Sequence, residues 1–149
     1  MKSTMKSAAA YLRDGKIFLH PDSRAIKGFW IACEPVLVTS KDDKNLGPQL
    51  LQIFETSTEG IPDPESLAKG DSSNVIRTLV KAAGARWYEG FADSAQCVGV
   101  RLDDVGMEFT PTGNGGPRKR FLYLKKRIRC NPIESEVAAS PIEAFDACE

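Results

Sequence analysis

The sequence predicts an α+β fold with a largely antiparallel sheet, built from an N-terminal and a C-terminal group of strands, with two or three helices packed on it. Stretches rich in β-branched and aromatic residues gather in the first forty residues and again after residue 96. Segments with helical periodicity separate these two groups, and a short one follows the second. The order of strands, helices, strands and a short helix is typical of segregated α+β proteins, not of alternating βαβ units.

Length and composition place the chain among single globular domains. The chain has 149 residues, and 42% of them are hydrophobic, enough to build one core without disulfide or metal staples. Lys plus Arg and Asp plus Glu both number 20, so the net charge is zero. No overall charge attracts the chain to nucleic acid or membrane, and an electrostatic partner must recognise a local patch. We expect one domain over residues 1–149, with residues 1–7 and the last few residues flexible.

The N-terminal strands begin with a hairpin. Asp14 and Gly15 separate the apolar stretches Ala9–Arg13 and Lys16–His20, and this dipeptide is a strong signal for a two-residue turn. Two further strands are expected at residues 28–32 and 36–39, because both stretches are rich in aromatic and β-branched residues.

Two helices are expected in the middle of the chain. Residues 46–56 carry apolar side chains at Leu46, Leu50, Ile53 and Phe54, which form one stripe at helical spacing. A second helix covers residues 74–83 and ends at Gly84. Residues 60–64 contain a glycine and two prolines and are expected to form a loop. Residues 86–91 hold three aromatic rings, which we expect to anchor a connection in the core.

The C-terminal group opens with a hairpin over residues 97–110. Val98, Val100, Met107 and Phe109 face the core by alternation, while Glu108 faces outward. A flexible loop at residues 113–117 follows, and the next segment, 118–129, reads as one strand. A short helix is expected to begin at residues 140–141, a Ser-Pro pair.

The strand over residues 118–129 carries the strongest local signal for binding. Seven of its twelve residues are Lys or Arg, and two aromatic rings share a face with basic side chains. Basic charge with stacking rings is typical of proteins that grip single-stranded nucleic acid. A protein-binding face, or a solvated edge strand whose lysines prevent aggregation, has the same composition. The candidate partner-binding residues here are Arg118, Lys119, Arg120, Phe121, Tyr123, Lys125 and Arg127.

Acidic residues of the C-terminal hairpin are a second candidate. Asp103 and Asp104 lie in the expected turn, and Glu108 lies on the outward face of the following strand. Acids in turns usually cap backbone groups and face water. The same side chains are suited to contact a basic partner, because complementary charge gives specificity without a shifted pKa.

Catalytic and metal-binding patterns are weak, and we expect a protein that is not an enzyme and has no catalytic residue, metal or cofactor. His20 is the only histidine, and no nucleophile-elbow or P-loop motif is present. The four cysteines include no C-x-x-C pair, which disfavours a zinc site. A small hydrolase that pairs His20 with a cysteine or acid stays open, because such partners meet in space and not in sequence.

The N-terminal residues lack the apolar stretch of a signal peptide, and no segment is apolar enough to cross a membrane. We expect a cytoplasmic protein with reduced thiols and no membrane partner.

Three groups of residues resemble the immunity proteins of contact-dependent growth inhibition systems. The resemblance spans about residues 13–145, and its weakest part is the segment 113–129. Its motifs are turns, prolines and aromatic anchors. They are Arg13–Pro21 with Gly28–Ile31 and Glu34–Val36, then Glu59–Pro64, and finally Ala82–Gly84 with Trp87, Gly90, Phe91 and Ala92 before Cys97–Leu102.

The resemblance implies a cytoplasmic protein without activity of its own. Proteins of this family bind the toxic C-terminal domain of a large exoprotein, often a nuclease, and block it. We therefore expect one-to-one binding to a cognate toxin domain, with partner specificity in the segment 113–129. The alternative is a module that binds RNA or single-stranded nucleic acid through the basic strand 118–129.

Overall fold

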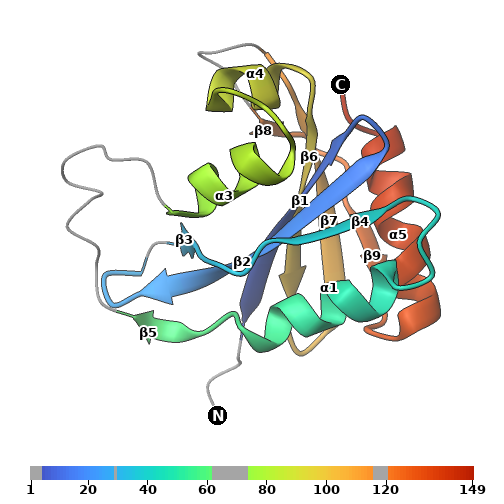
Figure 1. The fold of residues 1–149 in the computed structure, drawn as a ribbon. Coiled ribbons are helices and arrows are strands. Elements are labelled where there is room, and N and C mark those ends of the chain that lie inside the picture. Colours follow the sequence, from blue (N-terminus) through green and yellow to red (C-terminus); the bar gives the residue numbers. More distant parts are fainter. Residues whose placement is uncertain (1–4, 29, 62–73, 116–120) are drawn as a thin grey trace.

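The computed structural model describes residues 5–28, 30–61, 74–115 and 121–149, and Figure 1 shows how its elements are arranged. The described part contains nine strands in one sheet and four helices packed against it. The strands are β1 (Lys6–Arg13), β2 (Lys16–Ala25), β3 (Trp30–Ala32), β4 (Leu37–Ser40), β5 (Glu59–Ile61), β6 (Gln96–Leu102), β7 (Met107–Gly113), β8 (Leu122–Tyr123) and β9 (Ile128–Cys130). The helices are α1 (Leu46–Glu55), α3 (Asn74–Ala82), α4 (Tyr88–Asp93) and α5 (Glu134–Asp146).

The two groups of strands meet at the centre of the sheet, whose order is β3-β2-β1-β6-β7-β8. β4 and β5 also pair with β2, and β9 pairs with β7. Every pairing is antiparallel except that of β5 with β2. The predicted α+β class, with a largely antiparallel sheet made from an N-terminal and a C-terminal group, is confirmed.

The register of the central strands decides which side chains share a face. Ser7 of β1 lies opposite Asp22 of β2 and opposite Arg101 of β6. Arg101 in turn lies opposite Glu108 of β7, which lies opposite Arg129 of β9. Since directly opposed residues of paired strands point to the same side, these five side chains form a row across one face of the sheet.

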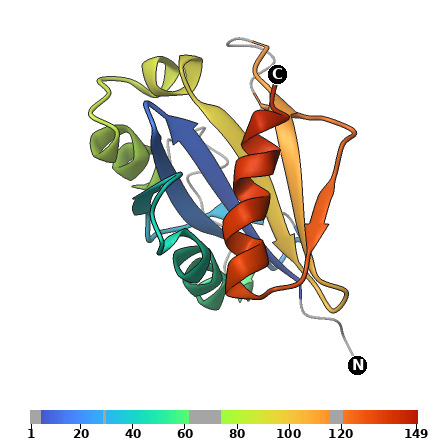
Figure 2. The ribbon, with the colours of Figure 1, turned by 90° about the vertical axis from the view of Figure 1, so that its right-hand side faces the viewer.

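The other face of the sheet is covered by α1 and α5 (Figure 2). Alternate residues of β1, β2, β6 and β7 point into this core, and Val98 and Phe109 are fully buried there. The predicted apolar stripe of α1 is confirmed. Its buried residues include Leu46, Leu50, Ile53 and Phe54.

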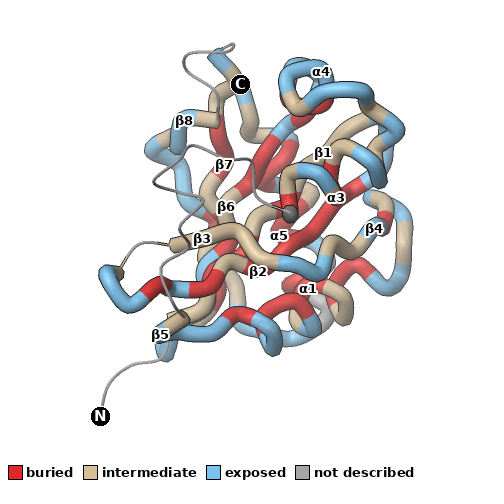
Figure 3. Tube along the Cα trace, turned by 60° about the vertical axis from the view of Figure 1, so that its left-hand side comes forward, coloured by how far each residue is buried: buried red, intermediate tan, exposed pale blue. Residues whose placement is uncertain are grey.

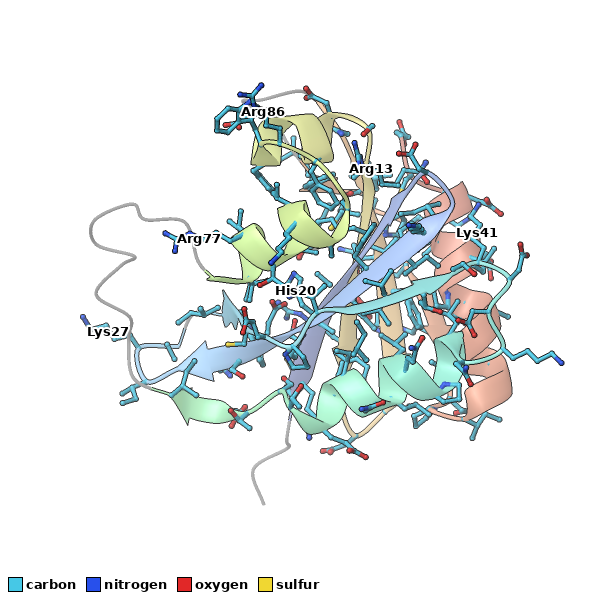
Figure 4. All side chains as sticks on the ribbon, viewed as in Figure 1. Arg13, His20, Lys27, Lys41, Arg77 and Arg86 are labelled. Atoms are coloured by element: carbon cyan, nitrogen blue, oxygen red, sulfur yellow. The ribbon has the colours of Figure 1, made fainter. Side chains whose placement is uncertain are left out.

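A second, smaller core lies on the side of the sheet away from α5, under α3 and α4. Phe18 of β2 meets Phe91 of α4 edge to face, with ring centroids 5.8 Å apart. Arg13, at the end of β1, fastens this layer to the sheet (Figure 4). Its guanidinium donates to the Ala83 carbonyl at 2.9 Å and to Ser94 Oγ at 2.7 Å.

Two expectations for the middle of the chain are wrong. The aromatic connection contains helix α4. Its Phe91 is buried in the second core and Tyr88 packs against that core as expected, but Trp87 is 64% exposed, so the expectation is wrong for this ring. Trp87 immediately precedes the helix, where its ring stacks with Arg86 at 5.3 Å and not with the core. The expected loop begins as strand β5, which pairs with β2, and residues 62–64 lie outside the described part.

The expected continuous strand over residues 118–129 is also wrong where the structure describes it. The chain pairs with β7 at β8 and keeps a backbone bond from the Leu124 N–H to the Pro111 carbonyl at 3.0 Å. It then leaves β7 at residues 125–127 and returns at β9. From Tyr123 to Ile128 it advances by five residues while β7 advances by three, so two residues bulge. The Arg127 guanidinium donates to the Leu124 and Lys126 carbonyls and closes this bulge.

The C-terminal helix is longer than expected. Helix α5 begins at Glu134, and Pro141 lies inside it instead of starting it. The missing N–H of Pro141 removes only one intrahelical bond, while Val137, Ala144 and Phe145 are buried against the sheet. At the ends of the chain, β1 already includes Lys6 and Ser7, and the Glu149 N–H donates to the Thr112 carbonyl at 3.2 Å.

Candidate binding face

The face of the sheet opposite α1 and α5 carries the strongest concentration of binding chemistry. Figure 3 brings this side forward, with β8, β7 and β6 left of centre, β3 and β2 below them and α4 at the upper right. Its end nearest Ser7 and Arg101 is covered by no helix of the described residues. We call this end the arginine face, and its residues are Ser7, Asp22, Arg24, Trp30, Gly99, Arg101, Glu108, Thr110, Tyr123, Arg127 and Arg129.

Trp30 holds two guanidinium groups on this face. The Arg24 guanidinium lies 5.8 Å from the ring centroid of Trp30, and that of Arg101 lies 5.9 Å from it. These three residues come from β2, β3 and β6, and cation–π attraction orders them across the sheet. Neither arginine forms an ion pair with any described residue. Arg24 donates to the Gly28 carbonyl, and Arg101 donates to the Met5 sulfur.

Glu108 ties the far end of the face together. Its carboxylate lies 3.2 Å from Arg127 Nε and 2.7 Å from Arg129 Nη2. All three side chains are partly exposed, so each pair adds no more than about 1 kcal/mol to stability. The bridge joins β7 to β9 and to the bulge before it, and it orders this edge of the face.

A pocket of about 230 Å³ opens between these two groups. Arg101 lines it from β6, and Arg127 lines it from the bulge. The glycine of the pocket, Gly99, leaves room for the ring of Tyr123, because a Cβ built at Gly99 would lie 2.8 Å from Tyr123 Cε1. Tyr123 is nevertheless 67% exposed, so the rest of its ring is available to a partner.

A buried polar cluster lies beneath the arginine face. The Ser7 hydroxyl donates to Asp22 Oδ2 at 3.1 Å, and His20 Nδ1 lies 3.5 Å from Asp22 Oδ1. Burial raises the pKa of the Asp22 carboxyl, and the charges of His20 and Arg101 and the bond from Ser7 oppose this shift. His20 and Ser7 are buried on the same side of the sheet as the arginines, so this cluster forms the buried base of the arginine face.

This cluster has only part of the geometry that the hydrolase hypothesis requires. His20 does lie beside an acid, but the Ser7 hydroxyl bonds to Asp22 and not to the imidazole, unlike a nucleophile with its base. Cys97 is buried, and burial raises the pKa of its thiol, which disfavours the reactive thiolate. All four cysteines are free, and the described residues include no group of three or more metal-binding side chains.

The predicted acidic candidates have separate partners. Asp103 Oδ1 accepts the N–H groups of Val105 at 2.8 Å and Gly106 at 3.1 Å, so it caps the hairpin turn. Asp104 is exposed in the same turn. Glu108 lies on the arginine face in its double ion pair. The structure therefore places one of the three acids on the candidate face.

The predicted basic candidates divide as well. Tyr123 and Arg127 lie on the arginine face, and Lys125 is exposed in the bulge. Phe121 is half-buried and packs edge to face on Tyr11 at 5.8 Å. Its φ of 54° turns the chain just before β8. Arg118, Lys119 and Arg120 lie outside the described residues.

Sequence reasoning missed several members of the face. Arg24 and Trp30 belong to N-terminal strands, and Arg101 belongs to the first C-terminal strand. Alternation along the strand predicts that Arg101 points away from the core. The sequence around Arg101 does not indicate which residues of distant strands lie beside it. The register of β1 with β6 is what brings these residues together.

Comparison with known proteins shows similarity at the level of fold. The sequence matches no protein-family model, and no curated protein matches it significantly. A solved structure of a protein of unknown function from Neisseria meningitidis has a TM-score of 0.78 at 13% identity, with 98% of this chain and 96% of that chain covered. One chain of the CdiA-CT/CdiI toxin and immunity complex from Yersinia pseudotuberculosis has a TM-score of 0.72 at 11% identity, with 98% of both chains covered.

The likeness to a chain of a toxin and immunity complex agrees with the immunity-like fold that the sequence motifs imply. In the described part of the chain, no helix is long and apolar enough to cross a membrane.

Proposed function

We propose that this chain is an immunity protein. It binds the toxic C-terminal domain of a contact-dependent growth inhibition exoprotein in the cytoplasm, one to one, and blocks that domain. A nuclease is the expected toxin. The observation that carries the proposal is the full-length similarity in fold to a chain that comes from a toxin and immunity complex. The resemblance of the motifs in residues 13–102 supports the same assignment.

The composition of the arginine face supports binding to a protein. Trp, Tyr and Arg are the residue types that most often dominate the energy of protein interfaces. Trp30, Tyr123 and Arg101 occur together here on strands of one sheet, so little order is lost when a partner docks. Neutralisation requires a tight complex, and a preorganised face of this kind provides one without any catalytic group.

The proposal is tested by rescue of growth. The test takes as candidate toxin the C-terminal domain of a large exoprotein whose gene is found next to the gene of this chain, and expresses it under an inducible promoter, with and without the chain. We expect growth arrest by the toxin domain alone, normal growth with the chain, and one complex on size-exclusion chromatography. An immunity protein from an unrelated system serves as control and gives no rescue. Growth arrest that persists with the chain present at equal level contradicts the proposal.

A further inference from the structure

We propose that the arginine face binds an acidic surface of its protein partner, with one carboxylate side chain in the pocket between Arg101 and Arg127. This inference rests on the proposed function and specifies the charge of the toxin surface that is recognised. It uses residues from both groups of strands, and not only the segment 113–129.

The balance of charge on the face is the first argument. Its described residues include the guanidinium groups of Arg24, Arg101, Arg127 and Arg129 and the carboxyl groups of Asp22 and Glu108. Both carboxyl groups are engaged within the molecule, Asp22 by Ser7 and His20, and Glu108 by its two arginines. Arg24 and Arg101 have no described ion-pair partner, so the face presents excess positive charge although the whole chain is neutral.

The geometry of the pocket is the second argument. Its volume of about 230 Å³ accommodates the end of an aspartate or glutamate side chain, and the hydroxyl-bearing Thr110 lines it beside the two arginines. Glu108 lines it as well, but Arg127 and Arg129 already neutralise its carboxylate. Arginine forks bind carboxylates through two parallel hydrogen bonds, and Arg101 supplies the fork here, because Arg127 already holds Glu108 and two backbone carbonyls. Trp30 holds the Arg101 guanidinium before a partner arrives, which lowers the entropic cost of this bond.

The aromatic residues favour a protein over a nucleic acid. Proteins that grip single strands stack successive bases on free aromatic rings. Two guanidinium groups already occupy Trp30, and Phe121 packs against Tyr11, which leaves Tyr123 as the exposed ring among the described residues of the face. One free ring between arginines suits a protein anchor better than a base-stacking platform.

The first test compares Arg101→Gln and Arg127→Gln with Arg86→Gln in binding to the toxin domain. Arg86 is a matched control, because it too stacks on a tryptophan, Trp87, but lies away from the face, beside α4 (Figure 4). We expect Arg101→Gln to weaken binding at least about tenfold, and Arg86→Gln to change it less than about twofold. Circular dichroism spectra that match the parent protein show that each variant is folded.

The outcomes separate this inference from the proposed function. If the toxin domain binds the parent protein and both face variants equally well, the acidic-partner inference is wrong while the immunity function stands. If the toxin domain binds no form of the protein, the proposed function fails, and a second measurement decides the inference.

That second measurement is a titration with poly-L-glutamate, followed by NMR signals of arginine Nε–H groups and of the tryptophan indoles. We expect saturable shifts at Arg101 and Trp30, no shift at Arg86, and loss of the Trp30 shift in Arg101→Gln. Equal shifts at Arg86, no shift at the face, or tighter binding of oligothymidine at the same salt concentration would each overturn the inference.

Discussion

Single residues set the shape and the charge of the arginine face. At Gly99 the Tyr123 ring occupies the space of a Cβ, so a side chain at this position would displace the ring. Asp22 is the carboxyl beneath the face, held by Ser7 and His20. Each of these positions gives a prediction that separates a role in binding from a role in stability.

Gly99→Ala is expected to move Tyr123 with little loss of stability. The atom that meets the new methyl group belongs to the outer part of an exposed ring, which turns aside cheaply, so the free energy of unfolding falls by less than about 1 kcal/mol. Urea unfolding and the NMR shifts of the Tyr123 ring measure the two effects. Gly90→Ala in α4 is the control, because a Cβ there meets nothing within 4 Å. An unchanged Tyr123 ring in Gly99→Ala would contradict the predicted contact.

Asp22→Asn is expected to stabilise the protein more at neutral pH than in acid, because it removes a partly buried carboxyl. Burial raises the folded-state pKa of Asp22 above its unfolded value of about 3.9, so the carboxyl lowers stability as pH rises through the interval between these values. Asparagine keeps an oxygen for the Ser7 hydroxyl. The gain in free energy of unfolding over the parent protein, measured in urea, should be larger at about pH 7 than at about pH 3.5. A gain that is larger in acid would show that the charges of His20 and Arg101 outweigh burial.

At the scale of elements, the hairpin of β1 and β2 depends on its turn. Asp14 and Gly15 have φ of 52° and 78°, the left-handed conformation that a two-residue turn of this type requires at both positions. Gly15→Ala should lower the free energy of unfolding by about 1 kcal/mol, because a side chain is strained at this φ while the space around it is open.

Thermal unfolding measures this effect, and Asp14→Asn is the control, since asparagine tolerates the same conformation and should change stability little. An alanine at position 15 that leaves the unfolding temperature unchanged would show that the turn does not limit stability.

Elements with a strong local pattern were predictable from sequence, and those fixed by distant contacts were not. The Asp14-Gly15 turn, the stripe of α1 and the hairpin of β6 and β7 follow from spacing within each segment. The interruption between β8 and β9 does not, because it depends on where each of these short strands pairs with β7, and that register leaves no pattern within the segment itself. Pro141 is a misleading local signal, since burial of Phe145 and its neighbours outweighs one lost helical bond.

The candidate site was predictable only in its C-terminal part. Tyr123, Arg127 and Glu108 were named from composition and alternation, and the structure places them on one face. Arg24, Trp30 and Arg101 join them through the pairing of β3, β2, β1 and β6. No periodicity within one strand reveals which residue of another strand lies opposite.

At the scale of the whole molecule, the positive face belongs to a chain of zero net charge, so attraction to a partner is local and sensitive to salt. If the partner surface is acidic, the association rate should fall several-fold between about 50 and 500 mM NaCl, while the dissociation rate changes less. Stopped-flow mixing with the toxin domain measures both rates. Arg24→Gln with Arg101→Gln should flatten this salt dependence, and Arg86→Gln should preserve it. A rate that rises with salt would contradict an acidic partner.

Alternate positions of the same strands serve the two faces of the sheet, one set in the core and the other on the arginine face. In β6, Val98 and Val100 are buried under α5, while Gly99 and Arg101 belong to the arginine face. The exposed arginines can therefore change identity without repacking the interior. If the proposed immunity function is right, substitutions at these alternate positions are a route to recognise a new toxin, and a protein engineer can diversify the same codons to retarget the scaffold.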